Sequence, residues 1–183
     1  MSNVPAATLE VWGRWQRCLH WALAATVIAS FATHEVSAAW HEWLGYAALA
    51  CAALRAVCGF TLSGYWRFSQ CVRGLGATWG YACAILRRNE KRYLGHNPLG
   101  AWMVLTLLAN TLLAGGSGWL ATTDRFWGVA WVGELHAFSG YAFVPLVLVH
   151  IAGGVFTSWR HRENLIAAMV HGQKTSAHSG DVA

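Results

Sequence analysis

The sequence predicts an all-α membrane protein, a bundle of four transmembrane helices with both termini in the cytoplasm. Two observations predict this class. Of the 183 residues, 56% are hydrophobic and only 11% are charged, whereas soluble domains carry about 25% charged residues. The chain also contains four apolar stretches long enough to cross a hydrocarbon layer of about 30 Å. These stretches lie near residues 17–36, 40–62, 99–121 and 132–157.

The basic residues predict how the four stretches are oriented. Eleven of the thirteen Lys and Arg residues lie before or at the start of the first stretch, between the second and third, or after the fourth. The positive-inside rule places these segments in the cytoplasm, so we expect a multi-pass protein of the bacterial inner membrane. Arg125 lies on the outer side, and Arg55 lies within the second stretch. This topology explains the net charge of +5, which therefore does not indicate nucleic-acid binding.

The segments between and after the stretches carry weaker signals. Residues 74–88 are compatible with an amphipathic helix on the cytoplasmic surface, with its arginines at the lipid headgroups. Residues 1–175 are expected to form one transmembrane domain, since no internal repeat divides them. Residues 176–183 are short, polar and rich in small side chains, which predicts a disordered tail.

Four histidines form a pattern across the predicted bundle. His136 and His150 are fourteen residues apart in one apolar stretch, which corresponds to a rise of about 21 Å, with both side chains on nearly the same helix face. Depth in the membrane then pairs His20 with His150 near the inner face, and His41 with His136 near the outer face. Ionisable side chains at this depth are costly and usually functional.

Each of the four histidines is followed one helical turn later by a small residue, which leaves room for a flat cofactor. Haem iron accepts two axial imidazoles, so the pattern predicts two bis-histidine haems. A zinc site is less suitable, because zinc prefers four ligands together. Close helix packing also uses small residues, and a single buried histidine is more often a packing element. Five cysteines without a CxxCH motif exclude covalent haem attachment. The small residues that follow His20, His41, His136 and His150 by one helical turn are Ala24, Gly45, Gly140 and Gly154, respectively.

Two further residues repeat the spacing of fourteen. Arg55 follows His41 at this distance, and its guanidinium could bind a haem propionate or a quinone oxygen at the inner depth. The alternative is an arginine that extends to the interface. His34 follows His20 at the same spacing and competes with His41 as the outer ligand. We interpret His34 as a supporting or interfacial residue.

The segment before the third stretch also contains a histidine, His96. Asn97 and Pro98 resemble a helix N-cap and first helical residue. We therefore interpret His96 as interfacial, with contact to the inner haem or a quinone as the alternative.

These residues resemble the bacterial di-haem cytochrome b superfamily, which includes the cytochrome b-561 proteins and the cytochrome b subunit of nickel–iron hydrogenases. The matching segments are RCLHW at residues 17–21, HEWLGY at 41–46, RAVCGF at 55–60, YLGHNPLG at 93–100 and HRENL at 161–165, together with the helix of His136 and His150. The resemblance implies a four-helix bundle with two non-covalent b haems and quinone chemistry. It assigns the haem ligands to His20, His41, His136 and His150, in a compact, stand-alone relative of the hydrogenase type.

The leading hypothesis is electron transfer in a respiratory chain, between the quinone pool and an outer-side partner such as a periplasmic cytochrome c or a hydrogenase-type subunit. One alternative is a superoxide:quinone oxidoreductase. An anionic substrate favours a positive outer surface, whereas the outer side carries only Arg125 against four acidic residues. A haem-free proton or metal transporter is the third hypothesis. The acidic residues are Glu35, Glu42, Asp124 and Glu134.

Overall fold

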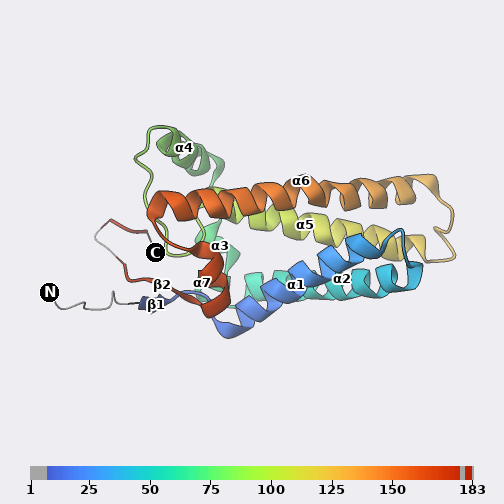
Figure 1. The fold of residues 1–183 in the computed structure, drawn as a ribbon. Coiled ribbons are helices and arrows are strands. Elements are labelled where there is room, and N and C mark those ends of the chain that lie inside the picture. Colours follow the sequence, from blue (N-terminus) through green and yellow to red (C-terminus); the bar gives the residue numbers. More distant parts are fainter. Residues whose placement is uncertain (1–7, 178–179, 183) are drawn as a thin grey trace. The chain divides into compact units, whose positions relative to one another are not determined.

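The computed structural model describes residues 8–177 and 180–182, and their fold is mostly helical (Figure 1). Four helices are long: α1 (Arg14–Thr33), α2 (Ala38–Thr61), α5 (Pro98–Ala121) and α6 (Ala130–His161). The shorter elements are β1 (Thr8–Glu10), a 3₁₀ turn (Gly64–Trp66), α3 (Phe68–Cys71), α4 (Leu75–Leu86), α7 (Leu165–His171) and β2 (Gln173–Thr175).

Three of the long helices, α2, α5 and α6, are long and apolar enough to cross a membrane. They expose large apolar side chains, such as Trp43 and Leu148, which the hydrocarbon of a bilayer would cover. The fourth long helix, α1, has 20 residues. Its first two turns contain Arg14, Arg17 and His20, which lower its mean hydropathy. The membrane class is therefore confirmed, and the crossing by α1 stays a prediction.

The described chain forms two compact units. The bundle unit consists of residues 18–59 and 104–148, and the terminal unit consists of the described parts of 1–17, 60–103 and 149–183. All four long helices contribute to the bundle unit. Each contributes at least one residue to the site described below.

Small residues bring the helices of the bundle unit close together. A Cβ atom on Gly115 of α5 would lie 2.8 Å from the Cβ of Leu49 on α2. The amide of Asn110 on α5 donates a hydrogen bond of 2.9 Å to the carbonyl of Ser139 on α6. Ser139 is fully buried. Small side chains and interhelical hydrogen bonds are typical of helix packing in membranes, because the hydrophobic effect does not drive helices together in lipid.

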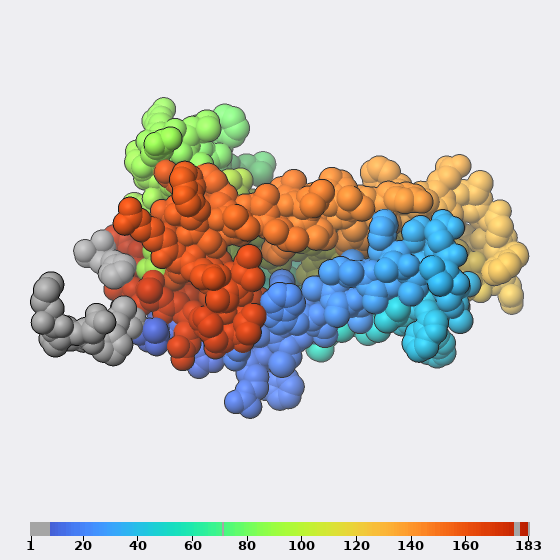
Figure 2. All heavy atoms as spheres, viewed as in Figure 1, coloured from blue at the N-terminus to red at the C-terminus, as the bar shows by residue number. Residues whose placement is uncertain are grey.

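The terminal unit joins the beginning of the described chain to its end. Strands β1 and β2 pair antiparallel, with Leu9 opposite Lys174. The carbonyl of Gly172 accepts hydrogen bonds from the backbone N–H groups of Val11 and Trp12. In Figure 2 the C-terminal segment, drawn red, lies against the N-terminal segment of the described chain, drawn blue. Gly172 ends α7 at φ 87°, a backbone conformation that favours glycine.

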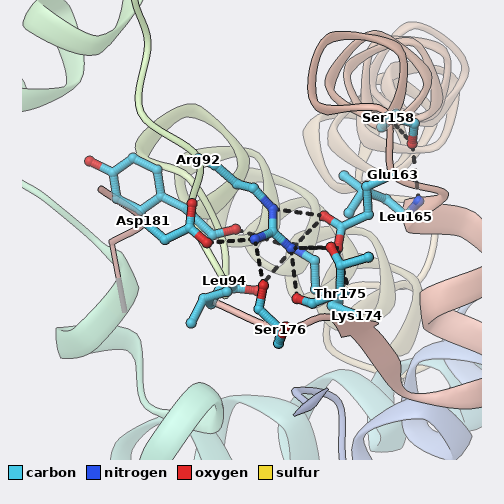
Figure 3. Close-up of polar contacts among 11 residues, drawn as sticks. Arg92, Leu94, Ser158, Glu163, Leu165, Lys174, Thr175, Ser176 and Asp181 are labelled. Atoms are coloured by element: carbon cyan, nitrogen blue, oxygen red, sulfur yellow. Dashed lines mark hydrogen bonds and ion pairs between the residues drawn. The ribbon is translucent and has the colours of Figure 1, made fainter. Parts of the chain in front are cut away.

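A mostly buried charge cluster holds the terminal unit together (Figure 3). Arg92 pairs with Glu163 at 2.8 Å and with Asp181 at 2.5 Å. Lys174 pairs with Glu163 at 3.3 Å and donates to the backbone carbonyls of Tyr93 and Leu94. The cluster therefore connects the segment before α5 with the segments on both sides of α7.

Three expectations concern the connecting segments. The interval 74–88 contains α4, while its position on a membrane surface stays a prediction. Helix α5 begins at Pro98, and the side chain of Asn97 accepts the N–H of Gly100 at 2.7 Å, so the expected N-cap is confirmed. Within the tail predicted as disordered, residues 178, 179 and 183 lie outside the described residues. Val182 is described and bonds to the backbone of Arg92 and Leu94.

Candidate metal centre

Two of the predicted ligands meet in the bundle unit. His41 lies in the first turn of α2, and His136 lies in the second turn of α6. Their Nε2 atoms are 3.5 Å apart, and the ring planes are inclined by 81°. Both side chains are partly buried. Two imidazoles that are 95 residues apart in the sequence therefore direct their Nε2 atoms toward a common point.

Backbone carbonyls determine the tautomer of both imidazoles. The Nδ1 atom of His41 lies 2.9 Å from the carbonyl oxygen of Ser30 on α1. The Nδ1 atom of His136 lies 2.9 Å from the carbonyl oxygen of Ala114 on α5. A carbonyl can only accept, so we assign the proton to Nδ1 in each ring. Each Nε2 atom of the neutral rings then carries a lone pair.

Two nitrogen lone pairs that face each other repel unless a cation or a metal lies between them. In metal-binding histidines, the other ring nitrogen usually donates to a carbonyl or carboxylate, which fixes the tautomer and increases the basicity of the ligand. His41 and His136 share this arrangement. Their geometry is therefore typical of a pair of metal ligands, rather than of two histidines that hydrogen-bond to each other.

The residues of this pair fit a haem better than zinc. Among the described residues, no group of three or more His, Cys, Asp or Glu side chains could hold a metal ion, whereas structural zinc takes four ligands. Haem iron takes four nitrogen ligands from the porphyrin, so one or two axial ligands from the protein are enough to hold it. Metal–imidazole bonds are about 2.0–2.1 Å long, so two opposed bonds require about 4 Å between the Nε2 atoms. The observed 3.5 Å is shorter than this value, so the preference for haem rests on the number of protein donors and not on the distance.

The predicted small residues leave space on the two ligand helices. A Cβ atom on Gly140 would meet no heavy atom within 4 Å, and one on Gly45 would meet only the hydroxyl of Ser30, at 3.7 Å. A flat macrocycle can therefore approach the backbone of α6 and α2 at these positions. This agrees with the expected role of Gly45 and Gly140, which stays a prediction.

Sequence reasoning missed three residues that support the pair: Ser30, Ala114 and Gly118. The carbonyls of Ser30 and Ala114 accept the two Nδ1 protons, and Gly118 lies directly against the ring of His136. A main-chain carbonyl has no sequence signal. For Gly118, the available signal was the run Gly115-Gly116-Ser117-Gly118 in an apolar helix.

The predicted inner pair is divided between the two units. His20 lies on α1 in the bundle unit, with its ring centroid 5.2 Å from that of Trp21. His150 lies on α6 in the terminal unit, as does Gly154, whose added Cβ would meet nothing within 4 Å. The pairing of His20 with His150 stays a prediction.

Arg55 is buried although it carries a charge. Its exposed fraction is 9%, and it lies on α2 among the small buried residues Ala52 and Gly59. Burial of a guanidinium requires polar partners. The role of Arg55 at a haem propionate or a quinone oxygen stays a prediction.

The two other histidines with uncertain roles make separate contacts. His34 follows α1 and is exposed, with Nδ1 at 2.6 Å from the carbonyl of Phe31 and Nε2 at 3.4 Å from the Glu35 carboxylate. The ring of His96 lies against that of Trp12 in the terminal unit, with ring centroids 4.8 Å apart and ring planes inclined by 59°. These contacts agree with supporting or interfacial roles for both residues.

Comparison with known protein families identifies the chain. Residues 11–172 match the model of the family described as prokaryotic cytochrome b561. No curated protein and no solved structure matches the sequence. The family match covers most of the chain, so the protein belongs to the prokaryotic cytochrome b561 family. Membership implies a membrane protein that binds haem b and transfers electrons across the membrane.

Proposed function

We propose that this member of the prokaryotic cytochrome b561 family transfers electrons through two bis-histidine b haems. His41 and His136 hold the outer haem, and His20 and His150 hold the inner haem. Electrons pass between the quinone pool of the bacterial inner membrane and an outer-side redox partner such as a cytochrome c. The observation that carries this proposal is the convergence of the His41 and His136 Nε2 atoms, 3.5 Å apart, with both Nδ1 atoms bonded to carbonyls.

The donor set favours electron transfer over oxygen chemistry. A bound haem would supply an iron centre that is oxidised and reduced by one electron, and two imidazole ligands would disfavour oxygen binding to it. The protein holds each imidazole through a carbonyl of a neighbouring helix, Ser30 for His41 and Ala114 for His136. Ligands that are fixed in this way move little between the two oxidation states, which keeps the reorganisation cost low.

Arg55 is assigned to the inner end of the electron path. It follows His41 by fourteen residues on α2, which places it about 21 Å further along the same face of the helix. A buried guanidinium at this depth can bind a haem propionate or a quinone oxygen. Its positive charge favours the reduced state of a nearby haem.

The pairing of β1 with β2 supports four spans with both termini in the cytoplasm. β1 precedes α1, β2 follows α6, and the two strands form one sheet. Chain segments that share a sheet lie on the same side of a membrane, which requires an even number of crossings between them. Three helices meet the criterion for a span, so α1 becomes the fourth. The positive-inside rule then places this side in the cytoplasm.

Pairwise removal of the ligands tests the proposal. His41→Ala and His136→Ala are each expected to remove the same haem, and His20→Ala and His150→Ala the other one. The measurements are the haem content per chain and the midpoint potential of the haem that remains. His34→Ala is the matched control and is expected to retain both haems. The proposal fails if His41→Ala and His136→Ala leave haems with different potentials, or if both variants retain two haems.

A further inference from the structure

Three glycines in the run Gly115-Gly116-Ser117-Gly118 of α5 have different surroundings. A Cβ atom on Gly116 would meet no heavy atom within 4 Å. One on Gly115 would lie 2.8 Å from the side chain of Leu49. One on Gly118 would lie 2.9 Å from Cε1 and 3.1 Å from Nδ1 of His136. Only Gly118 therefore faces a candidate ligand.

The ring of His136 packs against the backbone of α5. Ala114 and Gly118 are four residues apart and share a helix face. The carbonyl of Ala114 is the acceptor for Nδ1 at 2.9 Å. Non-bonded carbon atoms normally stay about 3.5–4.0 Å apart. A methyl group at residue 118 would therefore displace the imidazole from its present position and from the Ala114 carbonyl.

We infer that Gly118 is a positioning residue for the outer haem: its missing side chain allows His136 to reach the Ala114 carbonyl, and this hydrogen bond tunes the haem's potential. The inference rests on the proposed function. Donation from Nδ1–H to a carbonyl increases the basicity of the ligating nitrogen. A more basic ligand stabilises the oxidised iron and lowers the midpoint potential. Loss of the hydrogen bond raises that potential.

Alanine substitutions along the run test the inference on the purified full chain with both haems bound. Gly118→Ala is expected to raise the potential of one haem, the one that His136→Ala removes, and to change its low-spin electron paramagnetic resonance signal. Gly116→Ala is the matched control, because its Cβ meets nothing. Gly115→Ala adds a methyl against Leu49, so it is expected to lower thermal stability without a change in either potential.

Two results of this series would overturn the inference. One is a Gly118→Ala protein whose two potentials and resonance signals equal those of the wild type. The other is an equal shift in Gly116→Ala or Gly115→Ala, because a general effect of added methyl groups on α5 would then explain the change.

A second pair of variants applies even if Gly118→Ala alone does not fold. His136→Gly removes the ring that a methyl at residue 118 would touch, and added imidazole can then occupy the vacated place. The measured quantity is the imidazole concentration that restores the spectrum of the second haem. His136→Gly/Gly118→Ala is expected to need roughly tenfold more imidazole than His136→Gly, because the methyl overlaps the ring. Equal concentrations would contradict the inference.

The two levels of the proposal fail in different ways. If His41→Ala and His136→Ala leave the haem content of the wild type unchanged, the proposed function itself is wrong. If each removes one haem while Gly118→Ala behaves as wild type, only the role of Gly118 is wrong.

Discussion

Backbone carbonyls decide what the single residues His41 and His136 can do. A neutral imidazole has one N–H and one lone pair, and the hydrogen bond at one nitrogen fixes the state of the other. The carbonyls of Ser30 and Ala114 occupy Nδ1 in both rings, at 2.9 Å each. Both Nε2 atoms are therefore available to a metal. The orientation of each ring is fixed by its hydrogen bond to a carbonyl of a neighbouring helix.

The charge of Arg55 provides a prediction at the same scale. Arg55→Leu removes a buried positive charge, which is expected to lower the midpoint potential of the inner haem, because positive charge favours the reduced state. Arg55→Lys retains the charge and is expected to shift that potential less. A redox titration that resolves both haems measures the effect. Leu54→Ala, at an exposed neighbouring position, is the control. An unchanged inner potential in Arg55→Leu would mean that Arg55 serves only packing.

The sequence predicted the histidines of the candidate site but not their supports. His41 and His136 could be paired from depth alone, because helical rise converts residue number into position across the membrane. The roles of the Ser30 and Ala114 carbonyls could not be predicted, since every residue has a carbonyl. Only the packing of α1 on α2, and of α5 on α6, brings these two carbonyls to the histidines. The role of Gly118 likewise depends on its contact with His136, which is 18 residues away in the sequence.

At the scale of elements, the charge cluster of the terminal unit adds to a small hydrophobic core, in which Val11, Trp12 and Ala168 are buried. Strands β1 and β2 have three residues each, too few for a stable sheet alone. Glu163 lies between α6 and α7 and contacts both Arg92 and Lys174. Burial alone would raise the pKa of Glu163. The hydrogen bond and charge of Arg92, together with the charge of Lys174, hold that pKa below its ordinary value of 4.5.

The lowered pKa of Glu163 predicts how stability depends on pH. A carboxylate with a lowered folded-state pKa contributes stability above its unfolded-state pKa, and this contribution is lost as the pH falls through the folded-state pKa. Glu163→Gln is therefore expected to cost about 1–3 kcal/mol at pH 7. The difference from wild type is expected to shrink once the pH falls below the ordinary value of 4.5.

Denaturation of both proteins in detergent between pH 7 and pH 3 measures this difference. Lys91→Ala, at an exposed position beside Arg92, is the control and is expected to change stability by less than about 0.5 kcal/mol. A difference between wild type and Glu163→Gln that stays constant down to pH 3 would show that the Glu163 charge does not support the cluster.

The sequence predicts the long helices well but not the short strands. The predicted intervals 40–62 and 99–121 agree closely with α2 (Ala38–Thr61) and α5 (Pro98–Ala121), because long apolar runs and an N-cap have clear sequence signals. The pairing of β1 with β2 was not predicted. Three-residue strands show no usable alternation, and their partners lie at opposite ends of the chain.

At the scale of the whole molecule, the membrane class and the family both follow from the sequence. Few charges and four long apolar runs already excluded a soluble domain, and the match over residues 11–172 agrees with the predicted cytochrome b family. The structure adds the outer ligand geometry and the joining of the two chain ends. Together they describe a membrane protein of a cytochrome b family that transfers electrons through haem.

The most direct test of this account is the haem-to-protein ratio of the detergent-purified chain, measured together with reduced-minus-oxidised spectra. The account predicts two b-type haems per chain, both with the low-spin spectra of two axial imidazoles. One haem per chain would contradict the two-site arrangement and make His20 and His150 the first residues to reconsider. A chain without haem would contradict the proposed electron transfer altogether.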